Sequence, residues 1–116
     1  KHPEMMKPYL KRFVDELDKD VHVAVKRNLL RILQNYTLPE ELAGQAFDSA
    51  FNLMMNPKEA VAIRAFSITL VCTVCKQYPE LKHEVLQALD VIQENEYGPA
   101  ISVRIRKARQ ALDKFS

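Results

Sequence analysis

The sequence predicts an all-α fold in which three helix hairpins, with six main helices, stack side by side as one domain over residues 1–116. Three observations favour this class. Only 2 residues are Gly, which disfavours sheet proteins full of tight turns. Apolar residues recur at helical spacing along the chain. A short pattern also recurs at an interval of about 40 residues, as in repeat proteins.

Charge and composition exclude several classes of protein. The net charge is +2, so the whole molecule has no strong electrostatic attraction to nucleic acid or membranes. No apolar run is long enough to cross a bilayer. With two Cys and no export signal, we expect a reducing, cytoplasmic setting. Because the chain opens on Lys1-His2-Pro3 without an initiator Met, we expect it to be the C-terminal part of a longer protein.

The first hairpin is expected to contain a helix from Pro8 and a second helix over about Val21 to Asn35. Asp18 or Asp20 is expected to cap the second helix. The two apolar stripes consist of Leu10, Phe13, Val14 and Leu17, and then of Val25, Leu29, Ile32, Leu33 and Tyr36.

In the second hairpin, Thr37 and Glu40 are expected to form a capping box around Pro39. Gly44 in the helix that follows suggests a close helix approach. The core side of that third helix is formed by Ala43, Phe47, Ala50, Phe51 and Met54.

The fourth helix organises the chain. Asn56 is expected to be its N-cap, with Pro57 in the first helical position and Glu59 closing a capping box, and Pro79 ends it. The residues between are apolar on most sides, so neighbours must bury the helix on several flanks. Its narrow water-facing strip is expected to be Thr69, Thr73 and Lys76.

The third hairpin is divided by Gly98-Pro99. Its apolar stripes are Leu81, Val85, Leu89 and Ile92, then Ile101, Ile105, Ala108, Leu112 and Phe115. Cations cover the rest of the sixth helix, as the polar outer face of an end unit requires. At the other end, Met5, Met6 and Tyr9 lie where a preceding hairpin could dock, so we expect a monomer or weak self-association at the N-terminal edge.

A four-residue pattern (apolar, small, apolar, cation) opens the second helix of each pair. The third members of this tetrad, Val25, Ile63 and Val103, are 38 and 40 residues apart. The three copies are Val23-Ala24-Val25-Lys26, Val61-Ala62-Ile63-Arg64 and Ile101-Ser102-Val103-Arg104.

On these tetrads the chain resembles the HEAT family of armadillo-type helical repeats, whose hairpins carry Val-Arg near the start of the second helix. The resemblance covers repeats of about 8–36, 37–78 and 79–116, and it implies a right-handed α-α superhelix. The family's Asp six residues before the cation is present at Asp20, but Lys58 and Gly98 occupy the later positions. The family's kink proline is replaced by Arg12, so the array is divergent.

Small helical chains similar to this one are sometimes named adenylosuccinate lyase. The signature loop of that lyase family, Gly-Ser-Ser-x-Met-Pro-x-Lys-x-Asn-Pro, is absent here. Its only echo, Met55-Asn56-Pro57-Lys58, is interpreted as a helix cap, and the chain is far shorter than such an enzyme.

Cys72 and Cys75 form a C-x-x-C pair, but a zinc site needs two further ligands at suitable spacing. We expect both thiols to be buried as small apolar residues. The acidic run from Asp15 to Asp20 lacks the third oxygen ligand and the Gly of a calcium loop. The sequence therefore predicts no catalytic, cofactor or metal site.

Aligning the second helices through their tetrads places Arg31, Thr69 and Arg109 in one column. Arg27, Arg106, Thr73 and Lys76 lie nearby. The resemblance implies that second helices line the concave side, so this column predicts a mildly basic groove. It is either a solvated face kept for solubility or a groove for an acidic peptide or phosphates.

Two functions remain open. The first is a non-enzymatic scaffold or interaction module that binds a protein along the second-helix face, which rests on analogy of fold. The alternative is nucleic-acid binding, because HEAT-like alkylpurine DNA glycosylases use a basic concave face with aromatic residues around a damaged base. Against the alternative, the chain has no Trp and a net charge of only +2.

Overall fold

The structure, a computed structural model, describes the backbone of residues 3–95 and 98–114 and the side chains of residues 8–95 and 98–114. Within these ranges the chain is helical, and the expected all-α fold is confirmed. The expectations for the side chains of Met5, Met6 and Phe115 lie outside the described residues. The elements are α1 (Pro3–Leu17), α2 (Val23–Leu33), α3 (Glu40–Met55), α4 (Val61–Gln77), the 3-10 helix η1 (Pro79–Leu81), α5 (Lys82–Asn95) and α6 (Pro99–Asp113).

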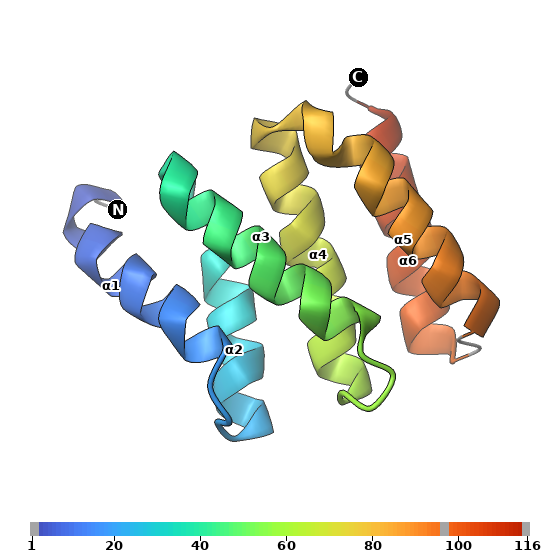
Figure 1. The fold of residues 1–116 in the computed structure, drawn as a ribbon, viewed down its shortest axis with the longest axis horizontal. Helices are drawn as coiled ribbons and strands as arrows, with labels where there is room; N and C mark the ends of the chain where they lie inside the picture. The colour runs from blue at the N-terminus through green and yellow to red at the C-terminus, as the bar shows by residue number, and fades with distance from the viewer. Residues whose placement is uncertain (1–2, 96–97, 115–116) are drawn as a thin grey trace.

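The helices form three antiparallel hairpins in two layers, with α1, α3 and α5 in front of α2, α4 and α6 (Figure 1). The shortest dimension of the molecule is 21 Å, which matches two helices at about 10 Å each. Helix α4 packs between α2 and α6, whereas α3 and α5 barely touch. The second helices therefore pack more closely on one another than the first helices do.

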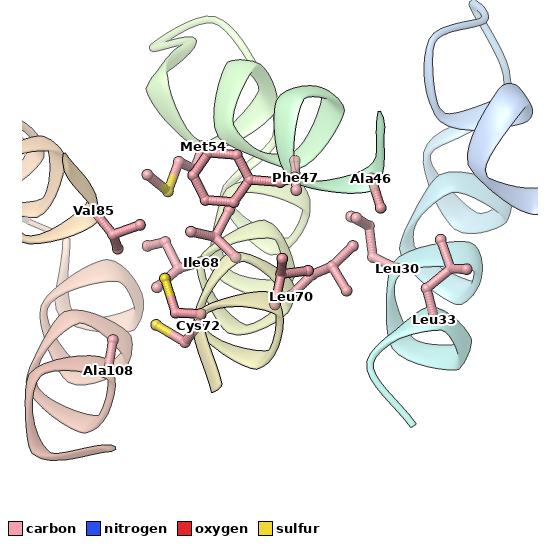
Figure 2. Close-up of a cluster of buried hydrophobic side chains, with 14 of the residues drawn as sticks. Leu30, Leu33, Ala46, Phe47, Met54, Ile68, Leu70, Cys72, Val85 and Ala108 are labelled. Carbon is pink, nitrogen blue, oxygen red and sulfur yellow. The ribbon is translucent and has the colours of Figure 1, made fainter. Parts of the chain in front are cut away.

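Helix α4 lies at the centre of the stack, as expected. It contacts helices of all three hairpins, and Ile63, Ile68 and Leu70 are fully or almost fully buried along it. In Figure 2 its flanks are covered by Leu30 and Leu33 of α2, Phe47 and Met54 of α3, Val85 of α5 and Ala108 of α6. Among the described residues, no helix combines the length and apolarity that crossing a membrane requires.

The expected cap of α4 is wrong. Asn56 ends α3 instead of starting α4, which begins at Val61. The Asn56 Oδ1 accepts a hydrogen bond from the Lys58 N–H at 3.0 Å, and its carbonyl accepts one from the Glu59 N–H at 3.1 Å. Asn followed by Pro is also the preferred start of a β-turn, with Pro at the second position. The same residues therefore make a turn between two helices.

Two other expected caps are also wrong. Helix α3 begins after Pro39 without a side-chain cap, so Thr37 and Glu40 form no capping box. Helix α2 is capped by His22, whose Nδ1 accepts a hydrogen bond from the Ala24 N–H at 3.1 Å. The Asp18 carboxylate accepts a hydrogen bond from the Ser49 hydroxyl of α3 at 2.7 Å. Asp18 therefore bonds a residue that is distant in sequence instead of capping the helix that follows it.

The buried face of α2 is narrower than its apolar stripe. Leu29, Leu30 and Leu33 are buried, but Val25 is 47% exposed and does not belong to the core. Helix α2 packs mainly against α1 and α4, and these cover the side centred on its leucines. Gly44 is exposed, and an added Cβ there would meet no atom within 4 Å, so the expected close approach at Gly44 is wrong.

The tetrad cation of the second hairpin, Arg64, is only 4% exposed. Its Nε donates a hydrogen bond at 2.9 Å to the carbonyl of Met54, in the last turn of α3. The last carbonyls of a helix lack intrahelical donors and carry partial negative charge, so a cation stabilises them. Arg64 thereby joins the end of α3 to the start of α4.

Equivalent tetrad positions allow a matched test of the stack. Ile63 is fully buried, whereas Val25 is 47% exposed. We expect Ile63→Ala to lower the free energy of unfolding by about 2–5 kcal/mol, because it leaves a cavity in the core. Val25→Ala should change it by less than about 0.5 kcal/mol. Urea unfolding measures both values, and equal losses would contradict the enclosure of α4.

Candidate functional site

Charge is divided between the two helix layers. On α2, α4 and α6, Lys and Arg outnumber acidic residues nine to one, and the single acid is Asp113. On α1, α3 and α5, nine acidic residues face four Lys or Arg. The nine cations are Lys26, Arg27, Arg31, Arg64, Lys76, Arg104, Arg106, Lys107 and Arg109. The small net charge therefore hides one basic and one acidic layer.

Within the basic layer, α4 and α6 enclose a groove of about 220 Å³. The lining residues of both walls lie at positions i, i+3, i+4 and i+7 of one helix face, which is helical spacing. We call this the α4–α6 groove, and it is lined by Thr69, Cys72, Thr73, Lys76, Arg104, Lys107, Ala108 and Ala111. None of the lining residues is acidic.

Arg104 is held in place at the edge of the groove. Its Nη1 donates a hydrogen bond to the Thr69 Oγ1 at 2.8 Å, and its guanidinium lies 5.4 Å from the centre of the Phe66 ring. The Thr69 hydroxyl in turn donates to the Ala65 carbonyl at 3.4 Å. The cation–π contact and the hydrogen bond orient the guanidinium, and no carboxylate among the described residues pairs with it.

The structure brings three of the predicted partner-binding residues together. Thr69, Thr73 and Lys76 all line the α4–α6 groove, with both threonines half-buried and Lys76 exposed. The Thr73 hydroxyl donates to the Thr69 carbonyl at 3.0 Å, which fixes its position along the helix.

The other four predicted residues lie outside the lining of this groove. Arg109 is directed toward α5, where its Nη2 forms an ion pair with Asp90 at 2.5 Å and donates to Gln93 at 3.1 Å. Arg106 is exposed on α6, and Arg27 and Arg31 are exposed on α2.

Sequence reasoning missed Arg104 and Lys107 as lining residues. The alignment through the tetrads used an offset of 40 residues for the last repeat. In the structure, α2, α4 and α6 begin at residues 23, 61 and 99, a constant 38 residues apart. That offset pairs Thr69 with Lys107 instead of Arg109. Pro99, a residue favoured in the first turn of a helix, was the signal that α6 starts before its tetrad.

A second hollow, of about 430 Å³, lies between α1 and α3. It is larger than the α4–α6 groove, but it contains charges of both signs, in Lys11 and Glu41. The Lys11 Nζ already pairs with Asp15 at 3.2 Å. This hollow therefore offers no set of side chains directed at one kind of ligand.

Cys72 and Cys75 are free and buried, which confirms the expectation that they act as small apolar residues. Burial is the main cause that raises the pKa of Cys72 to about 12 and that of Cys75 to about 11. Since the thiolate is the nucleophile and the metal ligand, these protonated thiols are inert at neutral pH. Across the described part of the chain, no group of three or more His, Cys, Asp and Glu could hold a metal ion.

Comparison with known proteins gives one match. Residues 1–112, nearly the whole chain, match the family model of the HEAT repeat domain. No curated protein and no solved structure matches the chain.

The buried thiols predict a loss of stability at alkaline pH. In the unfolded chain they ionise near the ordinary pKa of 9.0, whereas in the folded chain they stay protonated up to about 11. The contribution of the protonated thiols to the free energy of unfolding is thus fully present below pH 9, and it is lost as pH rises through the folded pKa values. At pH 10 we expect a loss of about 1 kcal/mol for each thiol.

Urea unfolding at pH 8 and pH 10 tests this expectation, with the Cys72→Ala/Cys75→Ala double variant as the control. Other groups titrate in both proteins, so the difference between them isolates the thiols. The double variant should lose less stability than the wild type. An equal loss in both would show that the thiols ionise normally in the fold.

Proposed function

This chain belongs to the HEAT repeat family, and from that premise we propose that it is a non-enzymatic protein-interaction module that binds a partner along its second-helix face. The proposed contact residues are Arg27, Arg31, Thr69, Thr73, Lys76, Arg106 and Arg109, together with Arg104 and Lys107. The observation that carries the proposal is the nine-to-one excess of cations on α2, α4 and α6.

This charge distribution supports an acidic segment as the partner's binding element. Complementary charge steers association and suppresses binding of basic surfaces. Because α4 packs on both α2 and α6, a segment that binds across their exposed cations would contact more than one helix. Within this face we expect Arg109 to contribute least to the attraction of an acidic segment, because Asp90 already neutralises its charge.

The chemistry of the groove supports a binding role over a catalytic one. A nucleophile requires an adjacent base or a lowered pKa. The Thr69 and Thr73 hydroxyls instead donate to main-chain carbonyls, and the pKa of the Cys72 thiol is raised. We further propose a cytoplasmic location, in which two free thiols stay reduced.

The alternative is a HEAT-like nucleic-acid-binding domain, and the same excess of cations favours it. The α4–α6 groove disfavours nucleic-acid binding, because none of its lining residues is aromatic. The ring of Phe66 lies beneath Arg104 and is not open for base stacking.

Charge reversal on the second-helix face tests the leading proposal. We expect affinity capture from a native lysate to lose its partners when Lys107→Glu or Arg31→Glu replaces the wild type, because each change places an acid against an acidic segment. The matched control is Lys58→Glu, an equal change of charge in the connection between α3 and α4. Identical partners with all four proteins would contradict the proposed face.

A titration of labelled duplex DNA, followed by fluorescence anisotropy, separates the two functions. Because a few exposed cations neutralise only a few phosphates, we expect at most weak binding at about 50 mM salt, and it should fall below detection by about 200 mM. Saturable binding that persists at the higher salt and is lost in Lys107→Glu would favour the nucleic-acid alternative instead.

A further inference from the structure

We propose that the α4–α6 groove is a receptor for one phosphorylated side chain of the partner segment. This inference rests on the proposed protein-interaction function and names the chemistry that the groove selects. Its basis is the arrangement of Arg104, Lys76 and Lys107 around a small hollow that has no acidic lining residue.

Arg104 supplies the directional element of the receptor. A guanidinium has five N–H donors in a planar fork, and this geometry matches two oxygens of a phosphate. Among the described residues the guanidinium forms one hydrogen bond to the protein, from Nη1 to the Thr69 Oγ1. It also lies over the Phe66 ring in a cation–π contact. The fork is therefore positioned before a ligand arrives, which lowers the entropy cost of binding.

Lys76 and Lys107 supply additional positive charge from the two walls of the same hollow. Among the described residues, no carboxylate pairs with either lysine or with Arg104. Arg109 and Lys11, by contrast, are paired with Asp90 and Asp15. Three cations left without a counter-charge around one hollow favour an anion of more than one negative charge, and a phosphate monoester carries about −1.5 to −2 at pH 7.

The size and floor of the groove favour a single side chain as the occupant. Its volume of about 220 Å³ is below the range of about 300–1,000 Å³ typical of sites for whole small molecules. Cys72, Ala108 and Ala111 give the floor an apolar character that fits the carbon atoms of a phosphorylated Ser or Thr. A nucleic acid would need a track of such sites with aromatic platforms, and the groove has one cluster of cations and no aromatic lining.

The first experiment uses inorganic phosphate as the probe. In a ¹H–¹⁵N NMR titration we expect saturable shifts at the amides of Thr69, Thr73, Arg104 and Lys107. The shifts should be lost in Arg104→Gln and kept in Lys58→Gln, which removes an exposed cation elsewhere. The absence of saturable shifts, or shifts spread over all surface lysines, would overturn the proposal. If Arg104→Gln does not fold, Lys107→Gln provides the same test at an exposed position.

The second experiment uses a degenerate peptide library with one central phosphoserine, compared with the same library carrying Ser or Glu. We expect the best phosphopeptides to bind at least about tenfold more tightly than their Ser and Glu counterparts. Their binding should weaken below about pH 6, where the phosphate gains a proton. Arg104→Gln should remove the preference, and Arg104→Lys should not restore it, because Lys lacks the fork.

The two proposals fail in different ways. Suppose that Ser and Glu peptides bind as well as phosphopeptides and that Lys107→Glu still abolishes partner capture. The proposal of a phosphate receptor is then overturned, whereas the proposal of an interaction module stands. If duplex DNA binds through Arg104 and Lys107 more tightly than any phosphopeptide, both are overturned. Loss of phosphopeptide binding in Arg104→Gln, with Lys58→Gln unaffected, supports both.

Discussion

The enclosure of α4 is the constraint on which the rest of the structure depends. This helix has so little polar surface that each of its flanks must be covered, and α2, α3, α5 and α6 cover them. The requirement sets the order of the stack, with second helices next to one another. Helix α4 also holds both ends of α3 through side-chain hydrogen bonds. The Gln77 side chain hydrogen-bonds both backbone groups of Leu38, and Arg64 holds the last turn of α3.

The basic layer follows from this arrangement. Since the second helices have few polar positions left, their charges, apart from that of the buried Arg64, are confined to the strips that still meet water. On α4 that strip is Thr69, Thr73 and Lys76, and α6 brings Arg104 and Lys107 to the same place. A net charge of +2 conceals this division, because nine acids on the first helices balance the cations of the second. Charge totals therefore say little about a stacked helical protein, whereas charge per layer is informative.

The helices and most of the core could be predicted from the sequence, because the period of apolar residues directly reports which side of a helix is buried. The caps could not. Asp18 bonds Ser49, which is 31 residues away, and such a partner leaves no local trace in the sequence. The groove was predicted in part: Thr69, Thr73 and Lys76 share one helix, so their spacing alone unites them. Lys107 and Arg104 depend on where α6 starts relative to α4, and a change of two residues turns a side chain to another face.

The position of α4 between the flanking hairpins also governs how the fold can come apart. In long solenoids each unit is stabilised mainly by its neighbours, and terminal units can fray while the rest persists. Here each flanking hairpin is itself part of the cover of the central one. Releasing either of them exposes α4, the most apolar helix among the three hairpins, to water. The shared cover of α4 therefore couples the opening of the three hairpins to one another.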